Sequence, residues 1–181
     1  MVHRIQRGAT GRRVVVAFCM LLVFSTMILP WAAARLAAYS GGGPSIALNF
    51  GFTPADAFAA LEALGPDGRT FYLLFLVTGD VIWPIVYALF LGTLLAWLFA
   101  RGFPSASPAQ RAILLPFLAL AADYAENVGI IAMILAYPAR LDGIAQITSM
   151  FQMIKWSLIG ASGLLVALGA IAAVVRRGAR A

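Results

Sequence analysis

The chain has 181 residues, of which 62% are hydrophobic and only 11% are charged. Soluble domains carry about 25% charged residues, so this composition excludes an ordinary water-soluble protein and is typical of a single polytopic membrane domain. The formal net charge of +6 comes from arginines near the ends of apolar segments, which favours contact with lipid headgroups and argues against a nucleic-acid partner.

Four apolar segments are long enough to cross a bilayer as helices, which requires about 20 residues. The first spans about 14–34, with Pro30 near its end. It is longer than the apolar core of a signal peptide, so we interpret it as a retained transmembrane helix. The other three are expected at about 71–100, 109–137 and 144–175. The sequence therefore predicts an all-α, four-transmembrane-helix bundle in one membrane domain, 1–181.

The longest connection, between the first and second spans, contains a helix start signal. Thr53 is a typical N-cap, Pro54 suits the first helical position, and Asp56 follows three residues after the cap. Apolar residues then recur on one face until a Gly-Pro pair. We expect a short amphipathic helix at about 54–64, at the membrane surface or over the mouth of the bundle, where it is a lid or a plain connector.

The distribution of arginines predicts the orientation. If the N-terminus is cytoplasmic, that side carries nine arginines and no acid: Arg4, Arg7, Arg12, Arg13, Arg101, Arg111, Arg176, Arg177 and Arg180. The opposite side carries three arginines and four acids: Arg35, Arg69, Arg140, Asp56, Glu62, Asp67 and Asp142. Because basic residues are enriched in cytoplasmic segments, we expect a multi-pass protein with both termini in the cytoplasm.

The remaining four charged residues fall inside the predicted spans: Asp80, Asp123, Glu126 and Lys155. At about 1.5 Å of rise per residue, Asp80, Glu126 and Lys155 lie within about 3 Å of one level, with Asp123 about one turn deeper. Charges at this depth face the protein interior and pair, so we predict one cluster joining the second, third and fourth helices. Adjacent carboxylates in a low dielectric rarely both ionise, and at least one is expected to be protonated at neutral pH.

Polar and aromatic residues share helix faces with these charges. The candidate ligand-binding residues are Trp83, Tyr87, Asn127, Gln152 and Trp156. Because Pro84 has no N–H, the carbonyl of Asp80 loses its helical donor beside the carboxylate. In a catalytic cluster, Glu126 or Asp123 would act as general acid or base. Its charge partner would be Asp80 or Lys155. Alternatively the cluster is structural, and only fixes which helix faces which.

No cofactor and no metal are predicted. Three carboxylates are chemically able to hold a divalent cation, but Lys155 would compete with it. The only histidine, His3, lies in the N-terminal tail, so no imidazole is available for a haem or zinc site inside the membrane. The only cysteine, Cys19, excludes an intrachain disulfide. Small residues form a face of the fourth helix suited to close packing within the bundle or against a partner: Gly160, Gly163, Ala167 and Ala170.

From Thr53 onward the chain resembles a group of bacterial four-helix inner-membrane proteins of unknown function. The motifs that carry the resemblance are Leu61-Glu62-Ala63-Leu64-Gly65 with Gly68-Arg69, Asp80 with Pro84 and Tyr87, Asp123 with Glu126-Asn127, and Lys155-Trp156. The resemblance implies the architecture and the bacterial cytoplasmic membrane, but no activity. A looser likeness, in helix count and buried carboxylates, links the chain to emopamil-binding and sigma-2-receptor type proteins, which use intramembrane acids around a sterol-like ligand. The motif order differs, and the membrane histidine expected of the isomerase members is missing.

Three functions are compatible with these features. The sequence favours an accessory or scaffolding subunit of a larger membrane complex, with membrane lipids and either other membrane subunits or a second copy as partners. The alternative is an enzyme or binding protein for a lipophilic small molecule (a lipid, sterol-like or quinone-like compound), which predicts an enclosed pocket at the cluster, open sideways to lipid. Proton or ion translocation through an oligomer is least supported, because no half-helix pattern or inverted repeat is visible.

Overall fold

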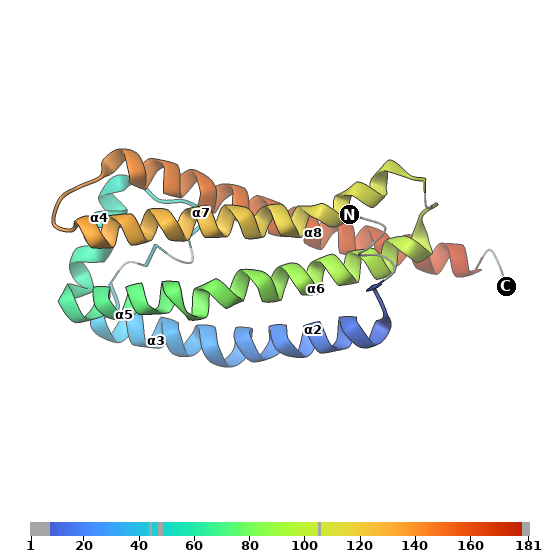
Figure 1. The fold of residues 1–181 in the computed structure, drawn as a ribbon, viewed down its shortest axis with the longest axis horizontal. Helices are drawn as coiled ribbons and strands as arrows, with labels where there is room; N and C mark the ends of the chain where they lie inside the picture. The colour runs from blue at the N-terminus through green and yellow to red at the C-terminus, as the bar shows by residue number, and fades with distance from the viewer. Residues whose placement is uncertain (1–7, 44, 47–48, 105, 179–181) are drawn as a thin grey trace.

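The computed structural model describes residues 8–43, 45–46, 49–104 and 106–178; His3, Arg4, Arg7 and Arg180 lie outside these ranges. Four helical segments are long and apolar enough to cross a membrane: Gly11–Tyr39, Gly65–Gly102, Pro108–Ala136 and Asp142–Gly178. They lie side by side along one axis, with the connections at the two ends (Figure 1). The predicted all-α bundle is confirmed, and the described ranges contain no β-strand.

The first span is a continuous helical rod with a widened turn in its middle. It consists of α2 (Gly11–Val23), a π-helical turn (Phe24–Ile28) and α3 (Leu29–Tyr39). Pro30 has no N–H to donate to the preceding turn, and a π-helical turn accommodates such a gap without ending the helix. The helix therefore passes through the proline and extends beyond both ends of the predicted range 14–34.

The second span is interrupted, which the sequence analysis did not predict. It consists of α5 (Gly65–Val77) and α6 (Gly79–Gly102). Between them Thr78 adopts φ −121° and ψ −79°, outside the helical region. Pro84 weakens the first turns of α6 because it cannot donate to the carbonyl of Asp80. The predicted span at about 71–100 lies within the helical segment Gly65–Gly102, and the break at Thr78 places Asp80 in the first turn of α6.

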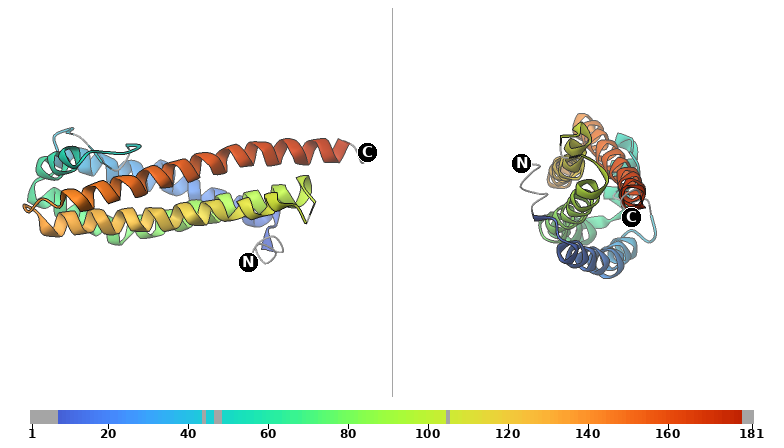
Figure 2. Two further views of the ribbon diagram at one scale, coloured as in Figure 1. Left: turned by 90° about the horizontal axis from the view of Figure 1, so that it is seen from above. Right: turned by 90° about the vertical axis from the view of Figure 1, so that its right-hand side faces the viewer.

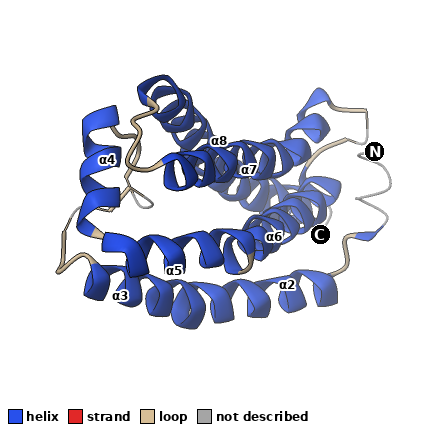
Figure 3. Cartoon of the chain, turned by 60° about the vertical axis from the view of Figure 1, so that its left-hand side comes forward, coloured by secondary structure: helices blue, strands red, loops and turns tan. Residues whose placement is uncertain are grey.

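The predicted short helix is present as α4 (Pro54–Ala63), and it packs over one end of the bundle (Figure 3). A capping box starts it: Asp56 N–H donates to Thr53 Oγ1 at 3.2 Å, and Thr53 N–H donates to Asp56 Oδ2 at 2.9 Å. The Thr53 hydroxyl also donates to this carboxylate, and these bonds hold the pKa of Asp56 below its ordinary value. The helix buries one face: Ala57, Phe58, Ala60 and Leu61. It therefore covers the bundle mouth.

The third and fourth spans lie close to their predicted ranges. The third begins with a 3₁₀ turn (Pro108–Leu114) that leads into α7 (Leu115–Ala136), and the fourth is α8 (Asp142–Gly178). α8 continues past the ends of α6 and α7 (Figures 1 and 2). α6, α7 and α8 pack together as a three-helix core, whereas the first span packs on α6 through α2 and on α5 through α3. Within the described chain, it makes no comparable contact with α7 or α8.

The close approach of α7 and α8 depends on Gly129. A Cβ at this position would overlap the side chain of Thr148 on α8, which is fully buried. We expect Gly129→Ala to lower the stability by about 1–3 kcal/mol, because the helices must shift to admit the methyl group. Thermal unfolding of the detergent-solubilised protein measures this loss. Gly160→Ala is the matched control, since nothing lies within 4 Å of a Cβ there; equal unfolding temperatures for both variants would contradict the packing.

The two ends of the bundle differ in charge. The end where α2 begins and α8 finishes carries six described arginines and no described acid: Arg12, Arg13, Arg101, Arg111, Arg176 and Arg177. The opposite end, where α4 lies, carries three arginines with four acids: Arg35, Arg69, Arg140, Asp56, Glu62, Asp67 and Asp142. In the part of the chain that the structure describes, the fold thus places the arginines at the two ends as their positions in the sequence predict.

Candidate functional site

The buried charges meet where α6, α7 and α8 pack together. Lys155 Nζ on α8 lies 2.5 Å from Glu126 Oε2 and 3.7 Å from Asp123 Oδ1, both on α7. Tyr87 on α6 donates its hydroxyl hydrogen to Asp123 Oδ2 at 3.1 Å. Asp123 and Glu126 are each 2% exposed and Lys155 is 7% exposed. The structure therefore brings residues of three helices into one charge cluster, as their predicted depths require.

Asp80 lies at the edge of this cluster and is not a partner of Lys155 in an ion pair of the described residues. The single ammonium group of Lys155 is already shared by Glu126 and Asp123. Asn127 Nδ2 donates instead to the backbone carbonyl of Asp80 at 3.3 Å, which is the carbonyl that Pro84 leaves without a helical donor. Asp80 and Lys155 were the two predicted charge partners for the acids of α7. In the structure the partner is Lys155.

A cavity of about 630 Å³ opens beside the cluster. This volume falls within the range of about 300–1,000 Å³ that is typical of small-molecule sites. The predicted site residues that line it are Asp80, Trp83, Tyr87, Asp123, Glu126, Asn127, Lys155 and Trp156. The rest of the wall is largely apolar, with contributions from the first span, α4 and α5. The pocket expected for a lipophilic ligand is therefore present at the cluster.

The first span forms the opposite wall of the cavity. Its lining residues are small or aliphatic: Leu21, Ser25, Leu29, Ala32, Ala33, Leu36 and Ala37. α8 also lines the cavity, yet the first span does not pack against α8 as it does against α5 and α6. The first span therefore borders the cavity without packing closely against α7 or α8.

Aromatic rings connect the first span to the cluster. Phe24, in the π-helical turn, stacks on Trp83 of α6 with ring centroids 6.1 Å apart. Trp83 contacts Tyr87 edge to face at 5.6 Å, and Tyr87 bonds to Asp123. The contribution of the first span was not recognised from sequence, because its apolar and small residues look like ordinary lipid-facing positions. The π-helical turn is a local structural sign that this part of the first span belongs to a functional site, since such turns are frequent at functional sites.

Described residues of the chain before α4 line the cavity at one end. Ile46 lines the cavity, together with Leu61 and Leu64 that flank it from α4 and its C-cap. Gln152 Nε2 on α8 donates to the carbonyl oxygens of Ile46 and Asn49, at 2.6 and 2.7 Å. Irregular backbone is tolerated inside a membrane protein where such bonds satisfy it. Because Ala60 and Leu61 of α4 also line the cavity, the structure favours the lid interpretation of this helix over that of a plain connector.

Gln152 is the predicted ligand-binding residue that does not line the cavity. Its side chain is fully buried, and its amide group is used to hold the connection between the first span and α4. Lys155 lies about one turn further along α8 and instead pairs with the acids of α7. Gln152 Nε2 thus holds this connection, whereas its Oε1 is buried without a hydrogen-bond partner among the described residues, and the prediction that Gln152 binds a ligand stays a prediction.

The cavity wall contains a buried donor without a partner. Trp156 Nε1 has no hydrogen-bond partner among the described residues, although the indole nitrogen can only donate. Leaving such a group unsatisfied costs about 1–3 kcal/mol. Lys155 Nζ lies 5.5 Å from the centroid of the same ring. A hydroxyl or carbonyl oxygen in the cavity would satisfy the indole N–H beside the charge cluster.

The cluster is poorly arranged for a metal ion. No group of three or more His, Cys, Asp or Glu side chains that could hold a metal occurs in the described ranges. The ammonium group of Lys155 occupies the carboxylate oxygens that a cation would need. The site therefore offers hydrogen-bond acceptors, one shared cation and an indole donor at the border of an apolar cavity.

No family model, curated protein or solved structure matches this chain. Fold and site define the class: a multi-pass helical membrane protein in which a buried ion-pair cluster borders an apolar cavity. The resemblance to the bacterial four-helix inner-membrane group stays a prediction.

Proposed function

We propose that the protein binds a lipophilic small molecule in the cavity bordered by Asp123, Glu126 and Lys155. The observation that carries this proposal is the coincidence of an apolar cavity of about 630 Å³ with a buried charge cluster and an unsatisfied indole donor. Specific small-molecule sites combine apolar walls with a few placed polar groups in this way.

The ligand that fits these walls has an apolar body and one hydrogen-bonding group. The indole N–H of Trp156 donates to a hydroxyl or carbonyl oxygen, and a carboxylate of the cluster accepts from a hydroxyl. Lipids, sterol-like alcohols and quinone-like carbonyl compounds all have this chemistry. If the bound group reacts, Glu126 or Asp123 is the general acid or base and Lys155 is its charge partner. The ligand reaches the site from the bilayer, between the first span and α8.

The location that we propose is the bacterial cytoplasmic membrane, with both termini on the cytoplasmic side. Six described arginines without an acid at one end of the bundle support this orientation.

Native mass spectrometry of the untagged protein, extracted gently from its own membrane, tests the binding role. We expect one lipophile per chain, and we expect Glu126→Gln to retain at most a tenth of it, because loss of one acceptor and rearrangement of Lys155 are together worth about 1.4 kcal/mol or more. Glu62→Gln is the matched control, since Glu62 is an exposed acid of α4. Equal occupancy in both variants, or no bound lipophile in the wild type, would reject the proposal.

The accessory-subunit hypothesis has one observation in its favour. Gly160, Gly163 and Ala167 are exposed on α8, and nothing lies within 4 Å of a Cβ at either glycine. This small-residue face points outward, where a second membrane helix can approach closely. Co-migration with a constant set of other subunits in the same experiment would support that role. For proton or ion translocation, the interruption of the second span at Thr78 is the one feature in favour among the described residues.

A further inference from the structure

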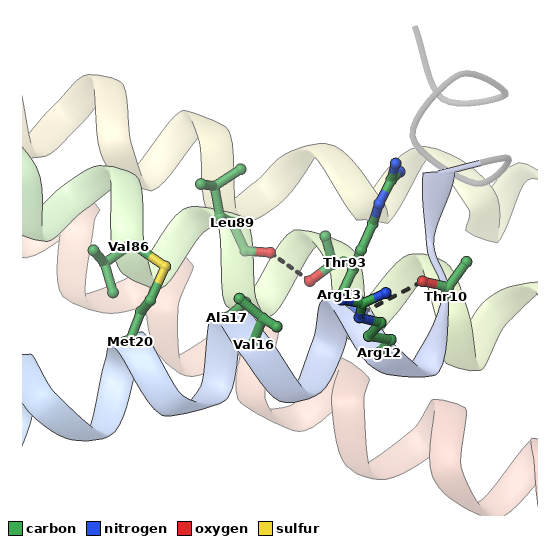
Figure 4. Close-up of a pocket in the computed structure, with 9 residues that line it drawn as sticks. All are labelled: Thr10, Arg12, Arg13, Val16, Ala17, Met20, Val86, Leu89 and Thr93. Atoms are coloured by element: carbon green, nitrogen blue, oxygen red, sulfur yellow. Dashed lines mark hydrogen bonds between the residues drawn. The ribbon is translucent and has the colours of Figure 1, made fainter.

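A second cavity, of about 600 Å³, lies between α2 and α6 at the arginine-rich end of the bundle (Figure 4). Its floor consists of the buried residues Ala17 and Val86, and its sides of the exposed apolar residues Val16, Met20 and Leu89. Figure 4 shows Thr10, Arg12 and Arg13 at the end of this groove where α2 begins, and Met20 and Val86 at the other. The groove is therefore basic at one end and apolar along its length.

The basic end has spare hydrogen-bond donors. Arg13 Nη1 donates to the carbonyl oxygen of Gly8 at 2.7 Å, which holds this guanidinium beside the first turn of α2 and leaves its other N–H groups unused. The guanidinium of Arg12 has no hydrogen-bond or ion-pair partner in the described ranges. No described acid lies at this end of the bundle. Two arginines without a carboxylate partner among the described residues leave positive charge and N–H donors at this end of the groove, which suit an anionic phosphate group.

The distance between the basic and apolar residues along α2 matches that between the headgroup and the acyl chain of a bilayer lipid. Arg12 and Met20 are eight residues apart, which corresponds to about 12 Å along the helix axis. The arginines lie where the first span begins, and the apolar groove runs from there toward the bilayer centre. We propose that this groove binds one anionic phospholipid, with its phosphate on Arg12 and Arg13 and one acyl chain along Val16, Met20 and Leu89.

Titration of the purified full-length chain in detergent with phosphatidylglycerol, followed by native mass spectrometry, tests this site. We expect one phosphatidylglycerol per chain and weaker binding of phosphatidylcholine, whose headgroup has no net charge. The double variant Arg12→Gln/Arg13→Gln should bind phosphatidylglycerol about tenfold or more weakly, because each arginine near an anionic surface is worth about 1 kcal/mol. The matched double variant Arg176→Gln/Arg177→Gln removes the same charge at the same end, outside the groove, and should change binding less than twofold.

A groove-filling variant tests the acyl-chain contact separately. Leu89→Trp should reduce phosphatidylglycerol binding several-fold with both arginines in place, since Leu89 lines the groove and is 43% exposed. Leu118→Trp, at a 56% exposed position of α7 outside the groove, should not. Inorganic phosphate in excess should leave the lipid bound, whereas displacement would show that the arginines bind free phosphate alone. That displacement, equal loss in the two arginine variants, equal binding of phosphatidylcholine, or unaltered binding by Leu89→Trp would each overturn the proposal.

Discussion

Lys155→Met should be the most destabilising of the substitutions considered, with an expected loss of about 3–5 kcal/mol, because breaking a buried ion pair leaves an uncompensated charge. Lys155 supplies the only ammonium group within 4.0 Å of Glu126 and Asp123 among the described ion pairs, and both carboxylates are almost completely buried. Methionine is unbranched like lysine and lacks only its terminal ammonium group in length, so the loss reports mainly on charge. Unfolding of the detergent-solubilised protein, followed by circular dichroism, measures it.

The double variant Lys155→Met/Glu126→Gln provides the control. It removes the ammonium group and the carboxylate nearest to it, so it should be more stable than Lys155→Met alone, and the cycle of four proteins gives the coupling free energy. Ordinary polar contacts between membrane helices contribute about 0.6 kcal/mol on average and at most about 1.7 kcal/mol. A loss within that range for Lys155→Met would show that the cluster is a simple interhelical contact, and the expectation would be wrong.

Ala33→Trp should abolish retention of the lipophile while the bundle still folds. Ala33 lies on α3, lines the cavity opposite the charge cluster and is exposed in the structure, so a large side chain has room to enter the cavity. An indole at this position competes directly with the apolar body of the ligand. The measurement is the mass of the chain extracted from its own membrane, compared with wild type, together with its unfolding temperature.

The neighbouring residue provides a matched control for this prediction. Ala34 is also exposed on α3 but does not line the cavity, so Ala34→Trp places the same side chain toward lipid and should retain the ligand. Retention of the lipophile at wild-type occupancy by Ala33→Trp would mean that the ligand lies elsewhere. Loss of the lipophile from both variants would mean that the first span, and not the cavity, determines retention.

The first span connects the two proposed sites. Its α2 segment forms one side of the phospholipid groove, and its α3 segment forms one wall of the cavity at the charge cluster. Different residues are involved, so the sites are separable by mutation. Glu126→Gln should leave phosphatidylglycerol binding unchanged, and Arg12→Gln/Arg13→Gln should leave the lipophile in the cavity.

The sequence alone determined the four spans, the capped helix α4 and the grouping of charges. Long apolar segments have few alternatives to a helix in lipid, because every backbone polar group must be satisfied internally. The depth of Glu126 and Lys155 followed from the constant rise of an α-helix, and the high cost of an isolated charge in a membrane required them to pair. The sequence also showed that the carbonyl of Asp80 lacks a helical donor, because Pro84 has no N–H. In the structure Asn127 donates to this carbonyl.

Only the tertiary structure decided where the cavity lies in the bundle and which polar residues line it. The wall that includes Ala33 looks like any lipid-facing surface in the sequence, and the cavity lies where the first span, which packs on α5 and α6, has no comparable packing on α8. The hydrogen bonds of Gln152 could not be read from the sequence, because its acceptors, the carbonyls of Ile46 and Asn49, lie more than 100 residues away along the chain. The break at Thr78 likewise has no breaking residue at the position itself. Apolar packing and long-range hydrogen bonds leave no periodic pattern in a sequence, so these features appear only when the helices are placed against one another.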